Sequence, residues 1–116
     1  MPGVVLDLDE LLNRVSADKA LALELCEMFL EDFRSKRPIF DKALVQDDFK
    51  SFKNTVHSLK GAAGNIAAKA LHQSLVDLEK ELGIKDKLRI KAEIESVDGD
   101  FLKLSRQIIE IRNYAN

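Results

Sequence analysis

The sequence predicts an all-α protein: an antiparallel four-helix bundle with a short additional N-terminal helix. Three long stretches carry apolar residues at alternating steps of three and four, the spacing of one helix face. No stretch shows the sustained alternation of apolar and polar residues that a half-buried strand needs. Hydrophobic residues make up 46% of the 116 positions, with only five Gly and two Pro. We therefore expect one domain, residues 1–116, with its own core.

The first two helices are marked by residues that can cap them. Asp7 can begin a short helix, and Ser16 or Asp18 can begin a long second helix that ends near Gln46. Pro38 falls inside the apolar pattern of this second helix. Because proline lacks the backbone N–H and clashes with the preceding turn, we expect the helix to kink or restart there.

The other three helices are bounded by aspartates and by one glycine. Asp47 or Asp48 can begin the third helix, and Asp86 can begin the fifth. Gly83 is a natural end for the fourth, since glycine readily adopts the left-handed conformation at helix C-termini. The expected third, fourth and fifth helices cover about 48–66, 68–82 and 86–113.

One face of the third helix carries residues that the core does not explain. At about 100° per residue, the apolar stripe centres about 130° from His57, so the imidazole points toward water. Gly61 and Gly64 lie on the side of His57, although a glycine costs a helix about 1 kcal/mol relative to alanine. Three lysines surround the ring on this face: Lys50, Lys53 and Lys60.

These residue types suit the acceptor of a phosphoryl group. A ring nitrogen is the nucleophile, bare backbone at Gly61 gives another protein close access, and Lys60 can hold an anion one turn away. The residues alone leave a second interpretation open, in which His57 is an ordinary surface residue and the Gly-Ala-Ala-Gly run simply ends the helix.

The segment His57–Ile66, HSLKGAAGNI, together with the Leu71 that follows it, resembles the signature of histidine-containing phosphotransfer domains, the relay modules of two-component signalling. The resemblance extends over essentially the whole chain in size, helix order, the Phe29–Asp32 segment and the proline at position 38. It implies a four-helix bundle whose exposed histidine accepts a phosphoryl group on Nε2 from a receiver-domain aspartate. The group then passes to another receiver aspartate.

The resemblance also implies roles for individual residues. His57 is then the phosphoacceptor, Lys60 the cation that stabilises the phosphate, and Gly61 the residue kept small for partner docking. Gly64 extends the strip without side chains. Lys50 and Lys53 add positive charge to the docking surface.

A count along the chain adds Glu79 to this group. If the third and fourth helices are antiparallel with their turn near Ala67 and Ala68, the residue level with His57 is number 78 or 79. Glu79 lies about 70° from the apolar stripe of its helix, on a flank that can face the third helix. Its carboxylate could accept a hydrogen bond from Nδ1–H and leave the Nε2 lone pair free. An ordinary charge at the bundle edge is the alternative interpretation.

Composition and motifs disfavour several other classes. A net charge of −2 gives no general attraction to nucleic acid or to anionic membranes. Cys26 is the only cysteine, and His57 and His72 lack metal-ligand spacing, so we expect no disulfide and no metal site. There is no apolar run of about 20 residues and no secretory signal, so we expect a cytoplasmic protein. No phosphate-binding loop is present, so we expect no nucleotide site and no kinase activity.

The resemblance further implies the partners. They are response-regulator receiver domains, a sensor histidine kinase, or both, with magnesium supplied by the receiver and no cofactor in this chain. We expect a monomer. The alternative is the phosphoacceptor domain of a chemotaxis-type histidine kinase, phosphorylated in trans by an ATP-binding domain. The dimerisation part of a histidine kinase is disfavoured because Ser58, not an acidic residue, follows His57. A non-catalytic adaptor is also open, binding by a groove of Leu8, Leu11 and Leu12 with Phe29 or Phe33.

Overall fold

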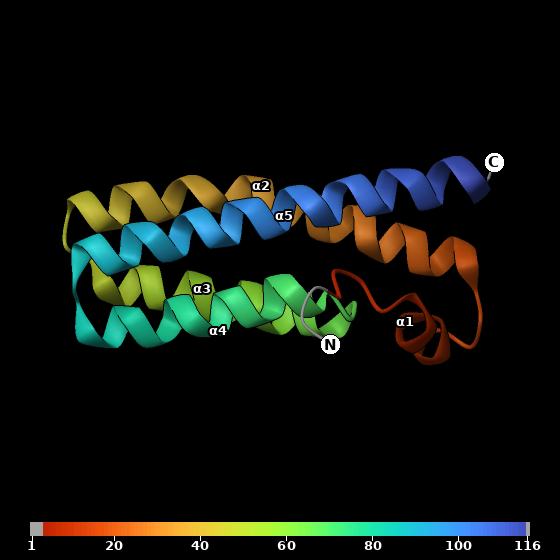
Figure 1. Cartoon of the computed structure of the whole chain (residues 1–116), viewed down its shortest axis with the longest axis horizontal. Coiled ribbons are helices and arrows are strands. Elements are labelled where there is room, and N and C mark those ends of the chain that lie inside the picture. The colour runs from red at the N-terminus through yellow and green to blue at the C-terminus, as the bar shows by residue number, and fades with distance from the viewer. Residues whose placement is uncertain (1–3, 116) are drawn as a thin grey trace.

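The computed structural model describes residues 4–115, and all of the regular structure in that range is helical. The five helices are α1 (Leu8–Arg14), α2 (Lys19–Val45), α3 (Phe49–Asn65), α4 (Lys69–Ile84) and α5 (Lys87–Ala115). Figure 1 shows α2 to α5 side by side, with α2 and α4 running in one direction and α3 and α5 in the other. The predicted antiparallel four-helix bundle with a short N-terminal helix is confirmed.

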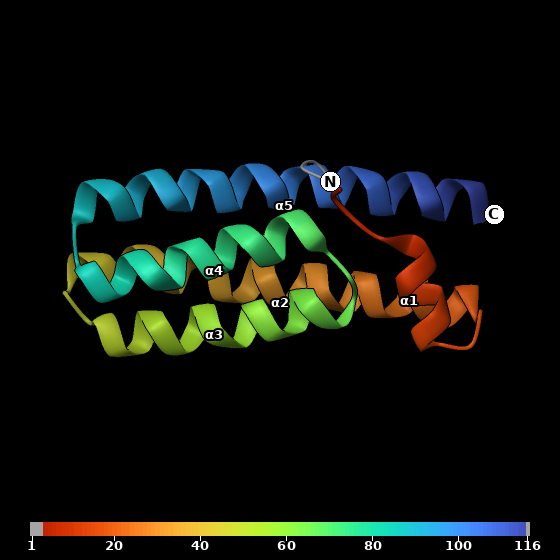
Figure 2. The same cartoon turned by 60° about the horizontal axis from the view of Figure 1, so that its bottom comes forward.

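The helices of the bundle differ in length, and this sets the place of α1. Helices α2 and α5 have 27 and 29 residues, whereas α3 and α4 have 17 and 16. Figures 1 and 2 show that the two long helices extend beyond the ends of α3 and α4 on the side where α1 lies. Helix α3 packs against α2 on one flank and α4 on the other. A residue on its outer face is therefore bordered by both neighbours.

Aspartates begin four of the five helices, as the sequence predicts. The side chains of Asp7, Asp18 and Asp48 each accept a hydrogen bond from the backbone N–H three residues later, the geometry of an N-cap. Asp86 accepts one from the N–H of Leu88. Each cap satisfies a donor that the first helical turn leaves unpaired, and contributes about 1 kcal/mol.

Helix α2 does not restart at Pro38, and α4 ends later than expected. Helix α2 continues as one element through Pro38. The ring lies on an exposed face, while the neighbouring Arg37 binds Asp98 of α5 at 2.7 and 2.9 Å and Phe40 is fully buried. Packing on both sides of the proline thus outweighs its cost of about 3 kcal/mol in a helix interior. Similarly, α4 does not stop at Gly83 but reaches Ile84, and Lys85 adopts the left-handed cap conformation at φ 64°.

The core fixes the orientation of α3. Phe52, Val56, Leu59 and Ala63 are all 0% exposed, and they form one stripe at steps of three and four. Because this stripe is locked between the other helices, the opposite face of α3 must look outward. That face carries His57.

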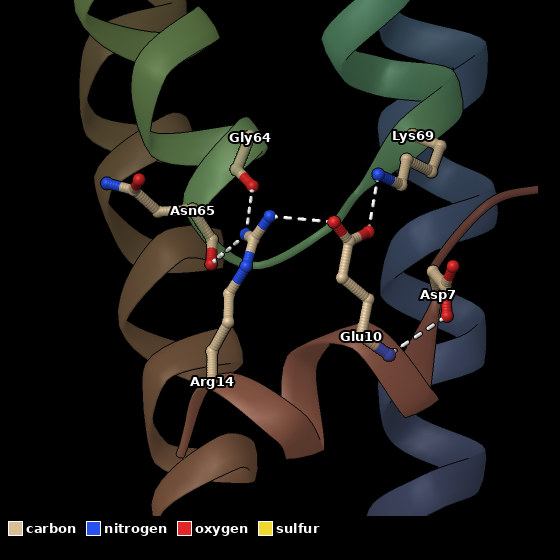
Figure 3. Close-up of polar contacts among 6 residues, drawn as sticks. All are labelled: Asp7, Glu10, Arg14, Gly64, Asn65 and Lys69. Carbon is tan, nitrogen blue, oxygen red and sulfur yellow. Dashed lines mark hydrogen bonds and ion pairs between the residues drawn. The ribbon is translucent and has the colours of Figure 1, made fainter.

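Helix α1 is fastened to the turn between α3 and α4 by a polar network (Figure 3). The Arg14 guanidinium donates to the carbonyl oxygens of Gly64 and Asn65 at 2.6 and 2.8 Å. These carbonyls belong to the last turn of α3, and that of Gly64 also accepts a hydrogen bond from the backbone N–H of Ala67 at 3.1 Å. Glu10 accepts from Arg14 at 2.8 Å and also pairs with Lys69 at the start of α4. Two residues of α1 thus tie the end of one bundle helix to the beginning of the next.

Candidate functional site

His57 stands on the solvent face of α3. Its side chain is 72% exposed, while Val56 and Leu59 beside it in the sequence are completely buried. The buried neighbours hold the backbone, so the direction in which the imidazole projects is set by the core. The ring is accessible to a second protein without any change in the bundle.

The carboxylate of Glu79, from α4, orients this ring. Glu79 Oε2 lies 3.2 Å from Nδ1 of His57. An ionised carboxylate can only accept a hydrogen bond, so we assign the ring proton to Nδ1. Nε2 then carries the lone pair, and no described residue donates a hydrogen bond to it. In its neutral form the imidazole therefore presents Nε2 to solvent as a nucleophile.

Lys60 binds the same carboxylate. Its Nζ donates to Glu79 Oε1 at 2.9 Å, and the two side chains are only 23% and 21% exposed. This hydrogen bond is the main reason that the pKa of Glu79 lies below its ordinary value; burial opposes the shift and the bond to His57 adds to it. Glu79 is thus ionised at neutral pH, as the assigned ring tautomer requires. The ammonium group that the sequence places near the phosphate is already engaged with a carboxylate.

The two glycines of α3 have different surroundings. An added Cβ at Gly61 meets nothing within 4 Å, so the backbone beside His57 is open. At Gly64 an added Cβ would lie 3.3 Å from Cδ2 of His72 on α4, and Arg14 already occupies the carbonyl oxygen. Gly64 is therefore only partly exposed, with the His72 ring beside it. Gly64 is small because the His72 ring packs against it, and the open backbone is that of Gly61.

The chain matches the model of a known protein family. The family model of the Hpt domain matches residues 24–114, which include α3, α4 and the residues His57, Lys60 and Glu79. The chain belongs to the Hpt domain family. Comparisons with curated proteins and with solved structures found no match. Hpt domains carry out histidine phosphotransfer in two-component signalling and interact there with receiver domains and kinases.

The remaining lysines predicted for the docking surface of this Hpt domain are exposed. Lys53 and Lys50 lie one and two helical turns before His57 on the same side of α3. Side chains on a helix lean toward its N-terminus, so the imidazole leans toward Lys53, one turn earlier, while Lys50 lies a further turn away. Both lysines add positive charge beside the ring.

Two residues of α2, Lys36 and Asp32, lie beside the site of this Hpt domain and were not predicted from the sequence. Lys36 of α2 donates from Nζ to Oγ of Ser58, the residue after His57, at 3.2 Å. The same ammonium pairs with Asp32, one turn earlier on α2, at 3.1 Å. A register count across the turn at Asp47 would have found Lys36, because it places residue 37 level with His57.

Other groups considered from the sequence lie outside this site. Burial raises the pKa of the Cys26 thiol to about 11, so Cys26 is protonated at neutral pH and is no nucleophile. Within residues 4–115, no set of three or more His, Cys, Asp or Glu side chains is arranged to hold a metal ion. None of the helices described for this Hpt domain is long and apolar enough to cross a membrane.

An apolar groove is present, but only some of the residues expected for an adaptor line it. A groove of about 310 Å³ lies between α1, α2 and α5, and Leu8, Leu11 and Leu12 line it. Phe29 and Phe33 are buried in the core and do not contribute. The groove contains no residue of the His57 site, so the two surfaces are separate features of the Hpt domain.

Proposed function

We propose that this Hpt domain is a phosphorelay intermediate. Nε2 of His57 accepts a phosphoryl group from the phosphorylated aspartate of one receiver domain and passes it to the aspartate of another. A single observation carries the proposal: the exposed ring is held through Nδ1 by Glu79, which leaves Nε2 as the free nucleophile.

The chemistry follows from this tautomer. The Nε2 lone pair attacks phosphorus and forms a P–N bond, while the P–O bond to the donor aspartate breaks and its electron pair leaves with the carboxylate. No base is needed, because Nε2 carries no proton. The ring gains positive charge as the bond forms, and the Glu79 carboxylate beside Nδ1–H stabilises that charge. The return transfer to an aspartate reverses these steps.

Lys60 supports the transfer through Glu79. Its ammonium holds the carboxylate at the ring and lowers the pKa of Glu79. Because Lys60 lies one turn from His57, its charge also favours the phosphoryl oxygens. Lys60 is therefore a positioning residue for the imidazole as well as a source of positive charge.

The surface beside His57 suits a receiver domain. The exposed backbone at Gly61 allows close approach, and Lys50 and Lys53 complement the acidic pocket in which a receiver holds magnesium. We propose that the magnesium belongs to the partner and that this chain needs no cofactor of its own. We also propose that the domain acts as a monomer in the cytoplasm.

The test is transfer from labelled receivers. A panel of purified receiver domains is phosphorylated with a radiolabelled small donor and mixed with the Hpt domain. We expect acid-labile, base-stable label on the wild type and none on His57→Gln or His57→Ala, both of which should fold normally because the ring is exposed. Label that survives in these variants contradicts the assignment. Labelling only by a kinase ATP-binding domain with ATP, and by no receiver, supports the chemotaxis-type alternative instead.

A further inference from the structure

Two lysines lie near His57, one toward α4 and the other toward α2, and they bind different partners. On the α4 side, Lys60 is mostly buried and binds Glu79, the carboxylate that also holds the imidazole. On the α2 side, Lys36 binds the neutral hydroxyl of Ser58 and the exposed carboxylate of Asp32. The first lysine is part of the mechanism that orients the ring, whereas the second has no such task.

The cost of moving each ammonium group follows from these partners. Moving Lys60 onto a phosphoryl group would leave Glu79 charged, largely shielded from water and without its main partner. Moving Lys36 would break a hydrogen bond to a hydroxyl and a partly exposed pair within one helix, whose carboxylate is more open to water than that of Glu79. Lys36 is therefore the easier of the two to release.

Phosphorylation creates a demand for a further cation. The phosphoryl group carries about two negative charges, and it forms next to a carboxylate whose own charge Lys60 already balances. Lys53 and Lys50 of α3 lie one and two turns before His57, and both are exposed to solvent on the same helix. Lys36 approaches from another helix and is held at the residue that directly follows His57.

We propose that Lys36 is the mobile phosphate-binding cation of this site. It leaves Ser58 and Asp32 and binds the phosphoryl oxygens when His57 is phosphorylated, while Lys60 stays on Glu79. The inference rests on the proposed phosphotransfer at His57 and assigns to Lys36 a role that sequence analysis gave to Lys60.

The experiment compares Lys36→Gln with two matched variants. Lys36→Arg keeps the charge, and Lys42→Gln removes the same charge from an exposed position about 120° around the same helix. The phosphodonors are phosphoramidate, which is too small to need a docking surface, and a phosphorylated receiver. The rate of label incorporation and the half-life of phosphohistidine are measured for each variant, and the pKa of His57 is measured by NMR.

With both donors we expect Lys36→Gln to lower the rate of labelling about fivefold and to shorten the half-life of phosphohistidine. Lys36→Arg should restore both values, and Lys42→Gln should behave as the wild type. The pKa of unphosphorylated His57 should change in Lys60→Gln but not in Lys36→Gln, since only Lys60 acts through Glu79. Asp32→Asn should accelerate labelling, because it releases the ammonium of Lys36.

Two results would overturn the inference. In one, Lys36→Gln matches Lys42→Gln with both donors. In the other, Lys36→Gln slows transfer from the receiver alone, which makes Lys36 a docking residue and not a phosphate ligand. Failure of the proposed function looks different, because the wild type itself then acquires no label at His57.

Discussion

Oε2 of Glu79 lies 3.2 Å from Nδ1 of His57, and Oε1 of the same carboxylate lies 2.9 Å from Nζ of Lys60. One side chain of α4 thus holds two side chains of α3 that are one helical turn apart. The reactive tautomer and the nearest cation both depend on this carboxylate, which makes Glu79 the first residue to test.

Replacing Glu79 should slow phosphotransfer while leaving His57 exposed. In Glu79→Gln the amide no longer stabilises the positive ring, and we expect the rate of labelling by phosphoramidate to fall about tenfold, the size of effect that losing an orienting carboxylate produces at metal-bound histidines. Nitrogen NMR shifts of the ring should show both tautomers in Glu79→Ala. Glu95→Gln, on an exposed position of α5, is the control for the loss of one charge. An unchanged rate in Glu79→Gln would mean that the carboxylate has no part in the transfer.

The contribution of Glu79 to stability should disappear in acid. Its pKa lies below the ordinary value of 4.5, chiefly because of the hydrogen bond from Lys60. A carboxyl group whose pKa falls on folding stabilises the native state above its unfolded pKa, and this stabilisation is lost as the pH drops through the folded pKa. Urea unfolding of wild type and Glu79→Gln should therefore show a constant difference in unfolding free energy above pH 4.5 and a shrinking one below it. A difference that does not vary with pH would exclude this linkage.

Substitutions at Gly61 should separate stability from partner access. Gly61→Ala meets no neighbouring atom, so we expect the free energy of unfolding to rise by about 1 kcal/mol. Gly61→Leu should also fold stably, yet its side chain covers the open backbone beside His57. Transfer from a receiver should then slow at least about tenfold, whereas labelling by phosphoramidate should not change. Equal rates of transfer from the receiver to the wild type and to Gly61→Leu would show that the partner does not approach the backbone at Gly61.

Substituting alanine at Gly64 should not stabilise the protein as it does at Gly61. In Gly64→Ala the new methyl group presses against His72, so the gain in helix propensity should be smaller than at Gly61 or should become a loss. In the background of His72→Ala the contact is absent, and the same substitution should stabilise the protein by about 1 kcal/mol. The double-mutant cycle measures the contact directly. Additive effects would mean that the two residues do not interact.

Removing Arg14 should loosen α1 and the last turn of α3. Arg14→Ala loses the hydrogen bonds to the carbonyls of Gly64 and Asn65 and the pair with Glu10, and because Arg14 is exposed we expect a loss of about 1 kcal/mol. Hydrogen exchange of the α1 amides should accelerate. Arg14→Lys keeps the charge but not the two-pronged geometry and should recover only part of the protection. Unaltered hydrogen exchange in Arg14→Ala would show that the apolar contacts of α1 suffice to hold it on the bundle.

Sequence patterns predicted the bundle well because they report burial. The stripe from Phe52 to Ala63 both marks α3 as a helix and determines that His57 faces outward. The contact between Glu79 and His57 also followed from counting, since an antiparallel pair with a short turn has only one register. Local signals were weaker guides where long-range packing opposes them. Pro38 and Gly83 lie inside helices, and the nearby Phe40 and Leu82 are buried in the core.

The contacts at the site that the sequence did not predict share one cause. A helical wheel gives the direction of a side chain but not what another helix places there. Gly64 shares a side with His57 on the wheel, and only the position of His72 shows that this backbone is covered. Lys60 was expected at the phosphate, and only the position of Glu79 shows what already binds it. To predict that side chains of α2 such as Lys36 reach the site, the register between α2 and α3 is needed as well.

The buried stripe of α3 has a consequence for the kinetics of partner encounter. The helix that bears the acceptor is anchored by four completely buried side chains, so a docking protein has little backbone left to order. Association should then proceed as the meeting of two preformed surfaces, at a rate governed by long-range attraction between opposite charges. Added salt should slow the approach of a partner far more than it hastens its departure.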